Sequence, residues 1–348
     1  MPAKIPATIV TGFLGAGKTT LIREMLGQAN GLRIALIINE FGDLGVDGEI
    51  LKGCGIEGCA EEDVVELSNG CICCTVAEDF VPTIERLLAR SEPPEHIVIE
   101  TSGLALPQPL VSAFNWPAIA TRVTVDGVVT VIDGKAVSEG RFAHDEAAVG
   151  ARREADASLD HETPLSELFE DQLSCADMVV VNKTDLLKPS ETAELSDRLA
   201  AQARNGVQVI PSAHGKLPLE VLLGQNAAAE ADLSGRHAHH HHHGDDHHHD
   251  HDHDDFESFV VSAPEVIDPQ SFTARVEQVI RSHDILRLKG FAAVQGKPMR
   301  LTLQAVGPRI ETYFDRPLTS DDPREARLVV IGQAGLDRAA ITSALQAA

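Results

Sequence analysis

Residues Thr11–Thr20 read TGFLGAGKTT, which matches the G-x-x-x-x-G-K-[ST] pattern of a phosphate-binding loop. An apolar run, Ala7–Val10, precedes this stretch, and a helical pattern of apolar residues follows from Leu21. In such a strand–loop–helix unit, glycines allow backbone N–H groups to close around phosphate oxygens, and the N-terminus of the helix faces the negative charge. The stretch therefore predicts a nucleoside triphosphate site formed by Gly12, Gly15, Ala16, Gly17, Lys18, Thr19 and Thr20.

Two side chains of this loop carry the chemistry. Lys18 is placed to reach the β- and γ-phosphates, and the Thr19 hydroxyl is placed to bind Mg²⁺. A second magnesium-side residue is expected at Glu100, which ends the apolar run His96–Ile99 and precedes Thr101-Ser102-Gly103. We expect Glu100 to orient a magnesium-bound or attacking water, so that Lys18 and Glu100 are the catalytic candidates. The Gly103 N–H is the expected γ-phosphate contact.

Composition narrows the class of protein. The chain has 348 residues and a formal charge of −24, which suggests about two domains and argues against nucleic acid as a partner. No stretch reaches the ~18 consecutive apolar residues of a membrane helix, and no signal peptide is recognised before the first apolar run. We therefore expect a cytoplasmic protein, in which six cysteines are better suited to bind metal than to form disulfides.

Short apolar, β-branched runs alternate with helical stretches through the first ~220 residues. This pattern predicts a doubly wound, mostly parallel α/β sheet of the P-loop NTPase type over residues 1–226, with its ligand at the carboxyl ends of the strands. The expected strands are Ile34–Ile38, His96–Ile99, Gly127–Ile132, Met178–Val181 and Val207–Ile210, and the expected helices are Thr83–Arg90, Pro164–Ser174 and Glu191–Ala203.

The remaining third of the chain differs in composition. Residues 227–255 are hydrophilic and rich in His and Asp, so we expect a flexible linker. Residues 256–348 again show strand and helix patterns, in the order strand, helix, several strands and a final helix from about Leu336. They predict a second, smaller α+β domain.

A base-recognition motif follows the expected strand Met178–Val181. It reads Asn182-Lys183-Thr184-Asp185, and the Asp185 carboxylate is suited to accept from the N1–H and the amine of guanine, donors that adenine lacks. The Lys183 stem can pack along the base, and a backbone N–H near Ser212 is positioned for the guanine O6. Together with the phosphate loop, this motif indicates GTP rather than ATP.

A cysteine cluster lies between the phosphate loop and Glu100. Cys71, Cys73 and Cys74 fall within four residues, and three thiolates suit Zn²⁺, Co²⁺ or Cu⁺; the alternative is a set of small buried apolar side chains. The roles of Cys54 and Cys59 stay open, whereas Cys175 lies in an apolar helix and is interpreted as structural. Two further candidates are Glu40 and Asp43. They are interpreted as switch residues that contact Mg²⁺, a water or the metal held by the cysteines; the alternative is a solvated turn.

The histidine run is a separate metal-binding candidate. Neutral imidazoles bind divalent transition metals, and the run includes His239, His240 and His241. Two interpretations stay open: weak auxiliary sites that collect metal, or a solvated spacer between domains.

The combination TGFLGAGKTT, NEFGD, GCICC, ETSG and NKTD resembles the CobW-type metallochaperone GTPases, a P-loop family, over essentially the whole chain. The resemblance implies slow GTP hydrolysis coupled to metal transfer. It implies that Cys71, Cys73 and Cys74 bind Co²⁺ in the Mg²⁺·GTP state, and that the metal goes to the large subunit of cobaltochelatase for cobalamin synthesis. The alternatives are a zinc chaperone of the same family and a metal-buffering GTP-binding protein without gated transfer. A signalling GTPase is disfavoured because it leaves the cysteines and histidines unexplained.

Overall fold

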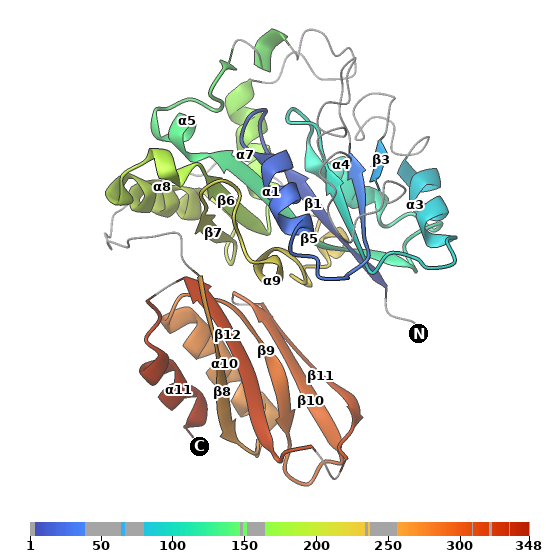
Figure 1. Cartoon of the computed structure of the whole chain (residues 1–348), viewed down its shortest axis with the longest axis vertical. Coiled ribbons are helices and arrows are strands. Elements are labelled where there is room, and N and C mark those ends of the chain that lie inside the picture. The colour runs from blue at the N-terminus through green and yellow to red at the C-terminus, as the bar shows by residue number, and fades with distance from the viewer. Residues whose placement is uncertain are drawn as a thin grey trace. The chain divides into compact units, whose positions relative to one another are not determined.

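The computed structural model of the chain describes residues 4–38, 64–66, 80–146, 149–151, 164–233, 236, 256–307, 309–319, 322–333 and 335–347. Contacts within the chain divide it into two units, Met1–Asp252 and His253–Ala348 (Figure 1).

A seven-stranded sheet forms the centre of the first unit. Its strand order is β3-β2-β4-β1-β5-β6-β7, and every described pairing in it is parallel. The strands carry apolar residues on both faces because helices cover both faces. The doubly wound P-loop architecture predicted from the sequence is confirmed. The strands are β1 (Ile5–Thr11), β2 (Ile34–Ile38), β3 (Val64–Glu66), β4 (His96–Glu100), β5 (Val123–Asp133), β6 (Met178–Asn182) and β7 (Gln208–Pro211).

The helices pack their apolar stripes on this sheet. On one face, Ile84 of α3 and Phe114, the residue after α4, join a core that contains Ile9 of β1, and α1 lies in front of the sheet in Figure 1. Among the described residues, no helix is long and apolar enough to cross a membrane. The helices of this unit are α1 (Lys18–Leu26), α3 (Val81–Leu88), α4 (Pro107–Ala113), α5 (Gly134–Ser138), α7 (Leu165–Cys175), α8 (Pro189–Gln202) and α9 (Leu219–Leu222), with 3₁₀ turns η3 (Thr184–Leu186) and η4 (Ala229–Ala231).

The segment after α9 differs from the prediction that a flexible linker starts at residue 227. Glu230 is buried and its carboxylate accepts hydrogen bonds from the Val125 N–H and the Thr124 hydroxyl. Arg236 is 2% exposed and makes a two-pronged ion pair with the buried Asp177 carboxylate, at 2.8 and 3.0 Å. Residues 227–233 and 236 therefore belong to the first unit. Composition concealed this because the two anchoring charges look like solvated linker residues.

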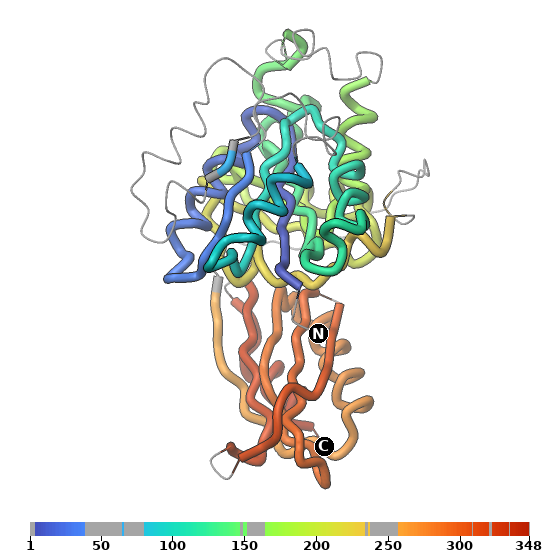
Figure 2. The backbone as a smooth tube through the Cα atoms, turned by 90° about the vertical axis from the view of Figure 1, so that its right-hand side faces the viewer, coloured from blue at the N-terminus to red at the C-terminus, as the bar shows by residue number. Residues whose placement is uncertain are grey.

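The second unit is an antiparallel sheet with helices on one side. Its strand order is β11-β10-β9-β12-β8, and α10 and α11 enclose an apolar core with Phe272, Val276 and Ile341; Figure 2 shows the strands and α10 side by side. The predicted α+β character is confirmed. Its elements are β8 (Phe256–Pro264), α10 (Pro269–Ser282), β9 (Ile285–Ala293), β10 (Met299–Val306), β11 (Arg309–Pro317), β12 (Glu325–Gln333) and α11 (Arg338–Gln346).

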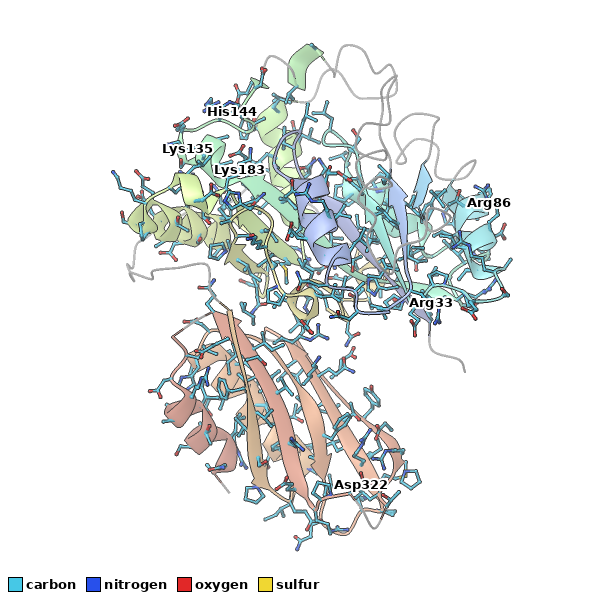
Figure 3. The ribbon with its side chains drawn as sticks, viewed as in Figure 1. Arg33, Arg86, Lys135, His144, Lys183 and Asp322 are labelled. Carbon is cyan, nitrogen blue, oxygen red and sulfur yellow. The ribbon has the colours of Figure 1, made fainter. Side chains whose placement is uncertain are left out.

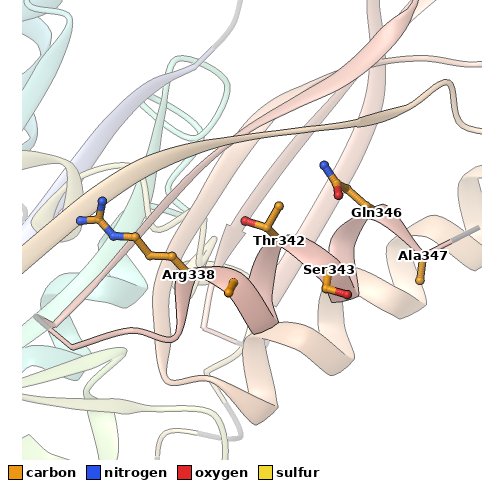
Figure 4. Close-up of a pocket in the computed structure, with 6 residues that line it drawn as sticks. Arg338, Thr342, Ser343, Gln346 and Ala347 are labelled. Carbon is orange, nitrogen blue, oxygen red and sulfur yellow. The ribbon is translucent and has the colours of Figure 1, made fainter.

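An open pocket lies along α11, lined by Arg338, Thr342, Ser343 and Gln346 among others (Figure 4). All of its lining residues belong to the second unit. None of them is part of the nucleotide motifs.

A buried polar group sits among strands β1, β4 and β5. The Thr8 hydroxyl lies 2.9 Å from His96 Nε2 and donates to Asp126 at 3.4 Å. Asp126 also accepts from the backbone N–H groups of Gly224 and Asn226, so it holds the chain that follows α9. Burial lowers the pKa of His96, and this effect exceeds the opposing attraction of Asp126.

We expect His96 to make the fold less stable as the pH falls below about 6.5, which is the pKa of a histidine side chain in the unfolded chain. Because the folded pKa is lower, the unfolded state binds the extra proton in this range, and stability rises with pH by up to about 1.4 kcal/mol per unit. Glutamine stays neutral, so His96→Gln should reduce the change in unfolding free energy with pH, measured by urea denaturation at several values between pH 7.5 and 5.5. The matched control is His144→Gln, at an exposed position; equal slopes for His96→Gln and the wild type would contradict this account.

Candidate functional site

The predicted nucleotide residues gather at one edge of the first sheet because its strands are parallel. Val10 of β1 is in register with Glu100 of β4, and Asp133 of β5 is in register with Asn182 of β6. Val181 is in register with Pro211 of β7. The loops that follow β1, β4, β5, β6 and β7 therefore leave the sheet side by side, as expected for a ligand site at the carboxyl edge.

The phosphate loop, Gly12–Thr19, depends on glycines at two crowded positions. Gly12 has φ +131°, and a Cβ atom there would lie 2.0 Å from the carbonyl oxygen of Val131. Gly17 has φ +100° and faces the Asn182 amide, 2.2 Å from where its Cβ atom would lie. Gly15 also has a positive φ of +78°, but nothing lies within 4 Å of its Cβ position. The turn thus needs glycine for its backbone at three positions and for space at two.

Lys18 and Thr19 end this loop and are the first two residues of α1. The Lys18 ammonium is folded back on the loop, 3.5 Å from the Phe13 carbonyl oxygen, and the residue is 7% exposed. The Thr19 hydroxyl donates to Glu100 Oε1 at 3.3 Å. A hydroxyl and a carboxylate side by side are oxygen ligands of the kind that Mg²⁺ prefers, so the two residues fit the predicted magnesium role.

Gly103 lies against the phosphate loop. A Cβ atom at this position would be 2.6 Å from the Leu14 nitrogen, and the Gly103 carbonyl accepts a hydrogen bond from the Gln172 amide of α7 at 3.2 Å. The same amide donates to the Ala105 carbonyl. Gln172 therefore fixes the loop that carries Gly103, a role that the sequence pattern did not reveal because Gln172 reads as an ordinary helix residue.

Asn182 joins the base motif to the phosphate loop. Its Nδ2 donates to the Ala16 carbonyl at 2.9 Å, and its Oδ1 accepts from the Gly215 N–H at 3.0 Å. Asn182 is 2% exposed, so it organises the two loops rather than facing the solvent. Asp185 lies at the rim with a 30% exposed side chain, and its carboxylate is 3.8 Å from His214 Nε2.

Ser212 is used differently from the expectation. Its N–H donates to the Val181 carbonyl at 2.8 Å, and its own carbonyl accepts from the Thr184 N–H and hydroxyl. These bonds fix the loop after β7 against the base motif. The Ser212 N–H is thus engaged in the sheet, and the next N–H along the chain, that of Ala213, is the better candidate for guanine O6.

Several predicted ligands lie outside the described residues: Glu40, Asp43, Cys54, Cys59, Cys71, Cys73, Cys74, His239, His240 and His241. Within the described residues, no group of three or more His, Cys, Asp or Glu side chains is arranged to hold a metal ion. Cys175 is described; it is buried, and burial raises its pKa to about 11. This suits the structural role assigned to it, because its thiol stays protonated at neutral pH.

Together, the sheet, the phosphate loop and the N-K-T-D turn define a P-loop nucleotide-binding protein of the GTPase class. Comparison with known families agrees: residues 6–211 match the family described as CobW/HypB/UreG, nucleotide-binding domain, and residues 256–348 match the Cobalamin synthesis protein cobW C-terminal domain. The chain belongs to the CobW family.

Curated relatives match along nearly the whole chain. One from Sinorhizobium sp., named zinc chaperone CobW, is 55% identical over 344 residues, which cover 99% of this chain and 97% of the relative. Another of the same name, from Pseudomonas aeruginosa, is 54% identical over 350 residues, which cover 99% of this chain and 92% of the relative. Among solved structures, the Zn(II)-bound YjiA GTPase from Escherichia coli is 24% identical, covers 98% of both chains and has a TM-score of 0.44.

Proposed function

We propose that the protein is a GTP-hydrolysing metallochaperone whose cargo binds at Cys71, Cys73 and Cys74 when Mg²⁺·GTP is present. The observation that carries this proposal is the register of β3 and β4 on either side of β2. Ile38, the last residue of β2, is in register with both Glu66 of β3 and Glu100 of β4. The chain therefore leaves the sheet after Glu66 at the nucleotide edge.

Chain length then limits where the cysteines can lie. Cys71 follows Glu66 by five residues in the sequence, and a chain segment of this length spans at most about 17 Å. Glu66 and Glu100 belong to strands two positions apart, a separation of roughly 10 Å. This connectivity supports a cargo site within reach of the γ-phosphate, where ordering of the intervening segment by Mg²⁺·GTP would couple metal affinity to GTP affinity.

The names of the relatives favour zinc as the cargo. Zinc also normally binds such ligands more tightly than cobalt does. Cobalt is the second candidate, with delivery to cobaltochelatase, because the family description of residues 256–348 refers to cobalamin synthesis.

The enzymatic part of the proposal is tested by phosphate release with GTP and with ATP. We expect turnover of GTP and little turnover of ATP. Lys18→Ala should lower GTP turnover by about 10²–10³-fold, the usual effect of removing one preorganised charge contact to a transition state.

The matched control is Lys188→Ala, since Lys188 has an 80% exposed side chain; it should leave the rate unchanged. Equal turnover of both nucleotides, or a Lys18→Ala rate equal to that of the wild type, would overturn the proposed GTPase.

A further inference from the structure

Asp133 ends β5 beside the base motif, and its carboxylate is held from two sides. It is 2% exposed. Its Oδ1 accepts from the Ala136 N–H at 3.0 Å and caps α5, and its Oδ2 accepts from the Lys183 ammonium at 2.6 Å. The Asp133 carboxylate is thus oriented by the start of α5 through one oxygen and holds the Lys183 ammonium through the other.

Lys183 itself is in an unusual conformation. Its φ of +63° and ψ of +32° are left-handed, which a residue with a side chain adopts at a cost of about 1–2 kcal/mol. With this backbone conformation, the Lys183 side chain reaches back to Asp133 at the end of β5. Figure 3 shows Lys183 on the same side of the domain as Lys135 of α5. Close packing of the two strand ends accompanies it, because a Cβ atom at Gly134 would lie 2.9 Å from the Asn182 carbonyl oxygen.

We infer that Asp133 is a positioning residue for the nucleotide base: it holds the Lys183 side chain in place before the nucleotide arrives. A free lysine side chain loses rotamer freedom when it is immobilised by a ligand, and here that loss has already occurred in folding. The side chain of Lys183 is 30% exposed, so its hydrocarbon stem is available to a purine ring while its ammonium is paired. This inference rests on the proposed binding of a guanine nucleotide.

The test is a double-mutant cycle in the full-length protein, read as the affinity for fluorescently labelled GDP. Asp133→Asn keeps an oxygen for the α5 cap and removes the negative charge that holds Lys183. We expect it to weaken GDP binding by about 3- to 10-fold, the usual effect of one side chain that must be ordered on binding. In a Lys183→Ala background, Asp133→Asn should have no further effect, because a residue that acts only through Lys183 cannot act without it.

A matched control separates positioning from helix capping. Asp337 caps α11 in the second unit through a 2.9 Å bond from the Ala340 N–H, and among the described residues no ion pair involves its carboxylate. Asp337→Asn should leave GDP affinity unchanged, and thermal denaturation of all variants checks that they fold.

Two outcomes would overturn the inference: wild-type GDP affinity in Asp133→Asn, or the same loss with and without Lys183. A failure of the proposed function looks different, since the wild type would then bind ADP as well as GDP.

Discussion

Gly12→Ala is expected to destabilise the nucleotide-free protein by about 2–5 kcal/mol, because backbone strain at a positive φ adds about 1–2 kcal/mol to an overpacking cost of about 1–3 kcal/mol. Its new Cβ atom would lie 2.0 Å from the Val131 carbonyl oxygen. That oxygen belongs to a central strand, so the clash cannot be relieved by a side-chain rotation. Nucleotide binding should be lost as well, since the loop must move away from β5. Urea denaturation without nucleotide measures the first effect, and GDP titration measures the second.

Gly15→Ala is the matched control for this prediction. It lies in the same loop with a φ of +78°, but its Cβ position is open. Only the conformational cost of about 1–2 kcal/mol is then expected. A Gly12→Ala protein as stable as Gly15→Ala would show that β5 yields to the phosphate loop, which contradicts the tight packing described above.

Asp185→Asn is expected to lower the affinity for GDP by at least about 10²-fold and to create affinity for xanthosine diphosphate. A carboxylate offers two acceptors to the two donors of guanine, whereas asparagine offers one acceptor and one donor, which leaves a guanine donor facing an amide donor. Xanthine has a carbonyl at that position and accepts from the amide. Competition of both diphosphates against labelled GDP gives the two affinities.

The control is Asp197→Asn on the exposed surface of α8, which removes the same charge far along the helix and should change neither affinity. If Asp185→Asn kept its preference for guanine, a residue other than Asp185 would select the base. His214, whose ring is 3.8 Å from the Asp185 carboxylate, would be the first candidate.

The fold could be predicted from the sequence because local patterns and global architecture agree. The run Ile34–Ile38 is apolar throughout and forms β2 with the same limits, since a strand covered on both faces leaves no position for a polar residue. Helix limits shifted by a residue or two, as at Leu165–Cys175 for a prediction of Pro164–Ser174. The predicted start of the linker was wrong for another reason. Arg236 is buried because it pairs with Asp177, 59 residues earlier in the chain, and no local sequence pattern indicates such a pairing.

The site was predictable where residue type alone determines the chemistry. Lys18, Thr19, Glu100 and Asp185 gather at one edge because parallel strands end together. The supporting residues were not predictable in the same way. Asp133 is a single acidic residue after the apolar run Gly127–Ile132; that signal was present in the sequence, but its meaning depends on the neighbouring strand that supplies Lys183.

The position of Arg236 also decides how the metal site should be tested. A variant that lacks the whole predicted linker, residues 227–255, would lose Arg236 and its buried ion pair to Asp177. Replacing only residues 237–255 with a Gly/Ser segment of equal length removes eleven of the 16 histidines and keeps this anchor. Weak imidazole sites would then not mask a tight thiolate site.

The most direct measurement is the Zn²⁺ affinity of this variant, by competition with a chelator, in the presence of Mg²⁺ with a non-hydrolysable GTP analogue and with GDP. Co²⁺ is titrated in parallel. The metallochaperone account predicts that metal binds about 5- to 150-fold more tightly with the GTP analogue, the range of typical coupling energies, and that Cys73→Ser abolishes the difference. Equal affinity with both nucleotides, or an unchanged difference in Cys73→Ser, would contradict it.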